Sequence, residues 1–199
     1  MVSTSYLTSA LAIGIFLGQV ACQPLLGTIK LYPSNNMCDD SDGHLECTNA
    51  PAGLCCFVRN SFILSTNTQL TSAPGPGDVT HQLFAAQGLP PNQNFCAVLL
   101  NQDRACAKTS QSGTAQAGSY RFTPHQRLAR LARTEGFPDQ EENTADKNCL
   151  QPDVFKITDG NTVYSAPMND TTIAHVLSLG RAEKIEWAKQ NGKAPAAGA

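Results

Sequence analysis

Cysteine is unevenly distributed along this chain of 199 residues, and its distribution restricts the folds that the chain can adopt. Six of the eight cysteines lie between positions 38 and 106, whereas the second half carries only Cys149. Such clustering is typical of a small domain that disulfide bonds hold together in an oxidising compartment. The chain has no CxxC, which disfavours a zinc site. We therefore predict disulfide bonds among Cys38, Cys47, Cys55, Cys56, Cys96, Cys106 and Cys149.

Two of these cysteines, Cys55 and Cys56, are adjacent in the sequence. Neighbouring side chains of a β-strand point to opposite faces of the sheet. We therefore expect Cys55 and Cys56 to bond to different partners, on the two sides of one strand. The sequence alone leaves the pairing of the cysteines open.

The N-terminus has the pattern of a secretory signal peptide. Residues 7–20 are uncharged and mostly apolar, and small residues and then Gln23 and Pro24 follow them. This run is shorter than the ~20 residues that a membrane-spanning helix needs. The chain is therefore predicted to be a secreted, extracellular protein without a transmembrane segment.

The position of the signal-peptide cut decides how many cysteines the mature chain contains. A cut after Cys22 places Val20 and Cys22 at the two recognition positions and assigns residues 1–22 to the signal peptide. The seven remaining cysteines then imply one free thiol or an intermolecular bridge. A cut after Ala21 is the alternative, and it retains Cys22 and an even number of cysteines.

Composition excludes several classes of protein. The chain is 41% hydrophobic, which is enough to form a core and argues against wholesale disorder. Its formal net charge is −2, whereas phosphate binding needs a basic surplus, so nucleic acid is not an expected partner.

The first half is predicted to form strands. Short apolar or alternating segments bounded by turn residues predict strands at 28–32, 54–59, 61–66 and 95–100, of which the last three are expected to be buried. Asp78 can cap a short helix over 79–87, and Gly88 can end it. The segment from Gly113 to Gly118 contains few large apolar residues and is predicted to be a loop and a domain boundary.

The second half carries clear helix and hairpin signals. Thr123 and Pro124 have the residue types of a helix N-cap and first position, which predicts a helix over 124–135. Asp159 and Gly160 are suited to the turn of a hairpin over 154–166. Asp170 can cap a last helical region that breaks near Gly180 and ends at Gly192.

These signals together predict an α+β fold with two parts. The first is a small, antiparallel, Greek-key-like and disulfide-bonded β domain at 23–112. The second, at 113–199, is a mixed α/β segment with two to three helices and a hairpin.

Two surface features in the second half are candidate sites. At helical spacing Arg127, Arg130 and Arg133 share the face opposite two leucines, which makes them a candidate binding face for an anionic partner or, peripherally, a membrane surface. An ordinary surface helix, neutralised by the acidic residues that follow it, is the simpler interpretation. Asn169 begins the sequon Asn-Asp-Thr and is a candidate glycosylation site.

The sequence gives little support to catalysis or metal binding. It lacks GxSxG, HExxH and a phosphate-binding glycine loop. A secreted hydrolase with His44 or His81 as general base is nevertheless a second hypothesis. The acidic residues Asp39, Asp40 and Asp42 suggest an EF-hand loop, but Cys38 and Asn49 occupy its two anchoring positions, which favours a solvated turn. No metal or cofactor is expected.

Part of the chain resembles a known family. The segments TIKLYPSNNMCD (28–39) and VRNSFIL (58–64) are similar to the opening strand and third strand of βγ-crystallin-like domains in secreted microbial proteins, including killer toxins. The resemblance covers residues 28–108 and implies a Greek-key fold. The family's calcium-binding pairs are absent, so it implies no calcium here. The signal peptide, adjacent cysteines and lack of catalytic motifs are also similar to those of the small secreted cysteine-rich proteins of fungi.

We therefore expect a secreted, cysteine-rich and non-catalytic protein, an effector or antimicrobial toxin that binds a host or competitor target. Its expected partner is an extracellular or host protein, or another cell-surface target. The alternatives are the hydrolase with a histidine base and a structural protein associated with the cell wall.

Overall fold

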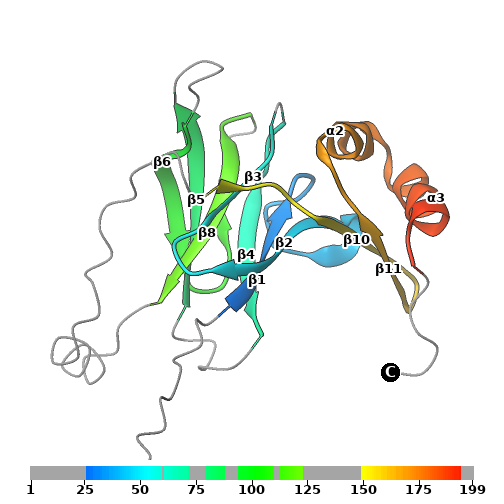
Figure 1. The fold of residues 1–199 in the computed structure, drawn as a ribbon, viewed down its shortest axis with the longest axis horizontal. Helices are drawn as coiled ribbons and strands as arrows, with labels where there is room; N and C mark the ends of the chain where they lie inside the picture. The colour runs from blue at the N-terminus through cyan, green and yellow to red at the C-terminus, as the bar shows by residue number, and fades with distance from the viewer. Residues whose placement is uncertain are drawn as a thin grey trace, which may run out of the picture.

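The computed structural model describes residues 26–59, 61–71, 79–87, 94–109, 113–122 and 149–193. These residues are mostly β-structure, in two sheets, together with two α-helices and one 3-10 turn (Figure 1). None of the described helices is long and apolar enough to cross a membrane.

The first sheet has the strand order β11-β10-β2-β1-β4-β7, and all of its neighbouring strands are antiparallel. The predicted strand 28–32 and the predicted hairpin 154–166 are confirmed, and Gly160 has the positive φ that the turn requires. The strands are β1 (Leu26–Tyr32), β2 (His44–Pro51), β4 (Ser65–Leu70), β7 (Ala107–Lys108), β10 (Val154–Asp159) and β11 (Thr162–Pro167).

The second sheet has the order β6-β5-β8-β3-β9, in which only the pair β3-β9 is parallel. Each sheet contains strands from both sides of residue 112, the predicted boundary. The strands are β3 (Cys55–Phe57), β5 (Val79–Gln87), β6 (Asn94–Asp103), β8 (Ala115–Phe122) and β9 (Cys149–Leu150).

The two sheets pack face to face over a shared apolar core. Ile29 and Leu31 of β1 belong to the same buried cluster as Leu83 of β5 and Tyr120 of β8. The sheets approach closely at Gly118, where an added Cβ would lie 2.8 Å from Leu31 Cδ2. A side chain at this position would therefore collide with the opposite sheet.

The predicted helix over 79–87 is wrong, because this segment is strand β5. Val79, His81 and Leu83 are buried, whereas the residues between them are only partly buried. This alternation has the period of a strand, and Asp78 and Gly88 suit turns as well as helix caps. The predicted loop at 113–118 is also wrong from Ala115 onward, where β8 begins.

Two predicted strands differ from the observed ones. The segment 61–66 becomes a strand only from Ser65, the first residue of β4. The segment 95–100 is a strand, within β6, but the second half of β6 is exposed and not buried. The buried strand predicted at 54–59 is confirmed by β3.

The last helical region is confirmed as two helices, α2 (Asp170–Ser178) and α3 (Arg181–Asn191), separated near Gly180. The N-cap of α2 is Asn169 and not the predicted Asp170. Figure 1 shows both helices beside β10 and β11, remote from β5 and β6. The helix predicted over 124–135, with its three arginines, lies outside the described residues.

Three disulfide bonds confirm the prediction for six of the seven cysteines, all except Cys149. Cys56 bonds to Cys47 and Cys55 bonds to Cys96, so the two adjacent cysteines have different partners, as expected. The third bond joins Cys38 to Cys106, whose Cα atoms are 5.9 Å apart. Cys149 lies on β9, paired in register with Cys55 of β3.

Candidate functional site

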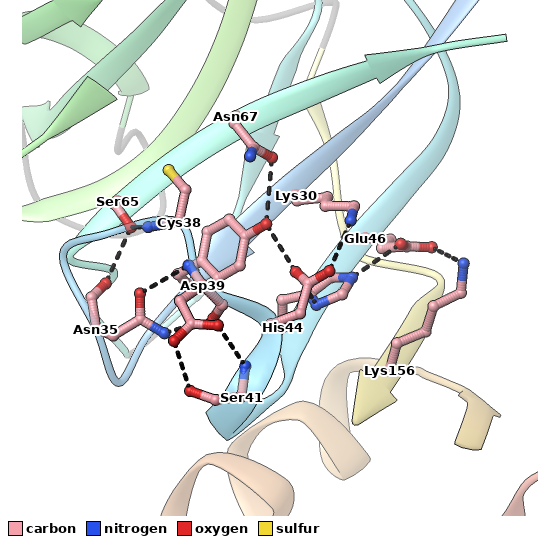
Figure 2. Close-up of polar contacts among 12 residues, drawn as sticks. Lys30, Asn35, Cys38, Asp39, Ser41, His44, Glu46, Ser65, Asn67 and Lys156 are labelled. Carbon is pink, nitrogen blue, oxygen red and sulfur yellow. Dashed lines mark hydrogen bonds and ion pairs between the residues drawn. The ribbon is translucent and has the colours of Figure 1, made fainter. Parts of the chain in front are cut away.

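A cluster of polar and charged side chains lies on the first sheet (Figure 2). Because side chains alternate along a strand, residues that flank Ile29 and Leu31 point away from the core. The loop between β1 and β2 covers this outer face, and it includes the 3-10 turn η1 (Asp40–Asp42). We name as the polar cluster Lys30, Tyr32, Asp40, His44, Glu46, Asn67 and Lys156.

His44 occupies the centre of the polar cluster and is only 3% exposed. Its Nε2 lies 2.9 Å from Glu46 Oε1, at hydrogen-bond distance. Its Nδ1 lies 3.0 Å from Asp40 Oδ1, an ion-pair distance, but without the geometry of a hydrogen bond. Both ring nitrogens therefore face carboxylates of the protein itself.

Glu46 is the most deeply buried acid of the cluster, with 2% of its surface exposed. Its second oxygen lies 2.9 Å from Lys156 Nζ on β10. Burial acts to raise the pKa of Glu46, but hydrogen bonds from His44 and Lys156, with their positive charges, outweigh it and lower the pKa. The carboxylate is thus held ionised between the His44 ring and the Lys156 ammonium group.

Asp40 links η1 to the strands below it. It lies 3.1 Å from Lys30 Nζ and accepts a hydrogen bond of 2.9 Å from the Tyr32 hydroxyl. Burial acts to raise the pKa of Asp40, yet the charge of His44 and these hydrogen bonds lower it. The pKa of Tyr32 is raised, first by burial and then by the negative charge of Asp40, so Tyr32 remains a donor.

The loop that carries Asp40 is held by its own side chains. Asn35 Oδ1 accepts from the Asp39 N–H, and Asp39 accepts from the Ser41 N–H as the cap of η1. Cys38, whose φ is +53°, anchors the loop through its disulfide bond to Cys106, the residue before β7. The predicted acidic turn is therefore a capped turn, and the described residues contain no group of three His, Cys, Asp or Glu placed to hold a metal ion.

The geometry does not favour His44 as a general base. A base needs a ring nitrogen that faces the proton of a substrate, whereas both nitrogens of His44 face Glu46 or Asp40. His81, the other histidine of that hypothesis, points into the core and is 5% exposed. The polar cluster instead joins β1, β2, β4, β10 and η1 into one unit.

His81 is expected to make stability depend on pH. Its pKa is lowered, chiefly by burial, which outweighs a backbone hydrogen bond with Arg104 and the charge of Asp103. The unfolded chain then binds more protons than the folded one as the pH falls below about 6.5, so stability decreases from that pH down to the folded pKa.

Urea unfolding at several pH values between 5 and 8 checks this expectation. His81→Leu should show a smaller loss of unfolding free energy between pH 7 and pH 5 than the wild type. His175→Gln is the matched control, because His175 is exposed on α2 and should leave the slope unchanged. An unchanged slope in His81→Leu would contradict the assignment.

The exposure of an apolar segment in β6 is not predicted by the sequence. Val98, Leu99 and Leu100 are 43%, 46% and 39% exposed, and β6 is an edge strand of the second sheet. A run of apolar residues predicts a buried strand, but the sequence does not reveal which strand lies at an edge. We name this segment, Val98–Leu100, the β6 apolar segment.

Of the remaining predicted sites, Asn169 is described and exposed, whereas Arg127, Arg130 and Arg133 lie outside the described residues. A shallow hollow of about 480 Å³ lies beside Asn169. Comparison of the chain with models of protein families, with curated proteins and with solved structures gives no significant match.

Proposed function

We propose that this chain is a secreted, disulfide-bonded protein that acts by binding an extracellular protein through the edge of β6. The proposed class is an effector or antimicrobial toxin, which the resemblance of residues 28–108 to secreted toxin domains supports. The observation that carries the binding proposal is the exposed β6 apolar segment, which lies on an edge strand among the described strands of the second sheet.

The other sheet edges of the described chain are short or covered, which sets β6 apart. β7 and β9 each have two residues. β11 ends at Pro167, and Ser165 in its middle is bridged by Lys193. Among the described strands only β6 offers an edge of ten residues, and proteins usually shorten, charge or cover such an edge.

The chemistry of β6 indicates an extended protein segment as its partner. Residues 94–102 carry no charge, and the main-chain groups of an edge strand can pair with an added strand. The pairing of β6 with β5 is interrupted by bulges near Leu83–Phe84 and Ala85–Gln87. Bulges hinder the regular pairing of two identical edges, whereas a flexible partner segment can follow them. The partner is therefore a different protein with an extended apolar segment.

Replacing Leu99 by lysine tests this surface. The charge would be desolvated by an apolar partner, so binding should weaken at least about tenfold, which corresponds to ~1.4 kcal/mol. The matched control is Val163→Lys, because Val163 of β11 is 47% exposed and lies on the other sheet. Fluorescently labelled protein is added to washed fungal, bacterial and plant cells, and the retained fluorescence is measured.

Retention of the wild type and of Val163→Lys, with loss for Leu99→Lys, is the expected result. Equal retention of the two variants, or no retention of the wild type on any cell, would contradict the proposal. Sedimentation of the purified protein tests whether β6 instead pairs two copies of the chain. A concentration-dependent dimer that Leu99→Lys abolishes would mean that β6 pairs with a second copy and not with a foreign protein.

A further inference from the structure

Asn169 caps helix α2 with only the oxygen atom of its side-chain amide. Its Oδ1 accepts hydrogen bonds from the N–H groups of Thr171 and Thr172 and so caps α2. The Thr171 hydroxyl also donates to this oxygen, at 2.8 Å. The amide nitrogen Nδ2 makes no hydrogen bond to any described residue, and Asn169 is exposed. The cap therefore leaves the glycosylation atom of the sequon available.

The surface next to this nitrogen is hollowed. The segments before β10 and before α2 lie side by side, since the Met168 N–H donates to the Asp153 carbonyl at 2.9 Å. Between them is the hollow of about 480 Å³, which is lined mainly by apolar surface. One of its lining residues, Asp153, is held in place, because both of its carboxylate oxygens accept hydrogen bonds from Thr48 of β2. Its lining residues are Gln151, Pro152, Asp153, Met168, Asn169, Asp170 and Thr171.

We infer that Asn169 is N-glycosylated and that the first N-acetylglucosamine of its glycan occupies this hollow. The sugar offers an apolar face to Pro152 and Met168, and polar groups to the Gln151 amide. The inference rests on the secretion part of the proposed function and not on the β6 surface.

The glycan is transferred from a lipid-linked oligosaccharide diphosphate. Nδ2 of Asn169 loses a proton and bonds to the anomeric carbon of the sugar, while the sugar–phosphate bond breaks and the lipid diphosphate leaves.

Two enzymatic treatments distinguish the attachment of the glycan to Asn169 from the binding of its first sugar in the hollow. The full chain is secreted from a yeast host, and portions are treated with an endoglycosidase that leaves one N-acetylglucosamine or with an amidase that removes the glycan and converts Asn169 to Asp. Aspartate is also a good N-cap, so the second treatment preserves the cap of α2. Intact mass and thermal unfolding are then measured for each form.

The glycosylated and the one-sugar forms are expected to have the same Tm, and the sugar-free form to melt a few degrees lower, as a loss of ~1 kcal/mol would cause. Asn169→Asp secreted from the same host should match the sugar-free form in mass and in Tm. A wild-type chain without glycan would overturn the inference, and so would equal Tm values for the one-sugar and sugar-free forms.

The disulfide bonds show which proposal has failed. If the glycan is missing while the bond Cys38–Cys106 and the other two form, the chain has passed through an oxidising compartment and only this inference fails. If the secreted fraction is empty and the cysteines of the cell-bound chain are reduced, the secretion part of the proposed function fails.

Discussion

Glu46→Ala is expected to lower the free energy of unfolding by about 1–3 kcal/mol, because it leaves the buried ring nitrogen of His44 without its hydrogen-bond partner. Glu46 and His44 are both almost fully buried, and the substitution leaves His44 facing an empty space and Lys156 without its acid. The cost arises at His44, which is buried and cannot regain water, whereas Lys156 is partly exposed and can be hydrated.

Chemical denaturation at pH 7 measures this loss, and Glu186→Ala is its control. Glu186 also pairs with a lysine, Lys189, but it is 64% exposed, so its removal should cost less than about 1 kcal/mol. Because the pKa of Glu46 is lowered in the folded state, its contribution is present above about pH 4.3 and is lost as the pH falls through the folded pKa. The difference between wild type and Glu46→Ala should therefore shrink in acid. Equal costs for the two glutamates at pH 7 would show that the polar cluster adds no stability.

Gly118→Ala is expected to destabilise the chain by about 1–3 kcal/mol through overpacking. The new Cβ would lie 2.8 Å from Leu31 Cδ2 and 2.9 Å from Thr66 Cβ, and closer still to the Thr66 hydroxyl. Both neighbours belong to the opposite sheet, whose main chain is fixed by strands on either side. Relief therefore requires the two sheets to separate locally.

Thermal unfolding of Gly118→Ala beside Gly180→Ala measures the effect. Gly180 precedes α3, and the nearest atom to its added Cβ is a Glu183 oxygen at 3.6 Å, an ordinary contact. Its substitution should change stability by less than about 1 kcal/mol. If Gly118→Ala also yields secreted protein of unchanged Tm, the close approach of the sheets at this glycine is not tight.

Local signals predicted those parts of the fold that local residues determine. Asp159 and Gly160 set the hairpin, and glycines bound α3 at both ends, so these elements were found from their turn and cap residues. β5 was mistaken for a helix because Asp78 and Gly88 suit both structures. The alternation of Val79, His81 and Leu83 was the signal that distinguishes them.

Features that depend on contacts between strands far apart in the chain could not be predicted from the local sequence. The start of β8 was predicted to be a loop because Ala115, Ala117 and Gly118 are small, and the two sheets approach closely at Gly118. In the polar cluster, His44 and Glu46 are two residues apart on one strand, a spacing that could have marked them as sharing a face. Lys156 comes from β10 in the second half, and no local pattern joins it to Glu46.

The pairing of β10 with β2 has a consequence for synthesis of the chain. Val154 is in register with Glu46, more than a hundred residues earlier, so β2 gains this neighbour only when the C-terminal hairpin has been made. Pairings of such high sequence separation form slowly. Until then the nascent first sheet has an open edge along β2 that other chains can join, and ribosomal products that stop before residue 154 keep that edge permanently and are prone to aggregate.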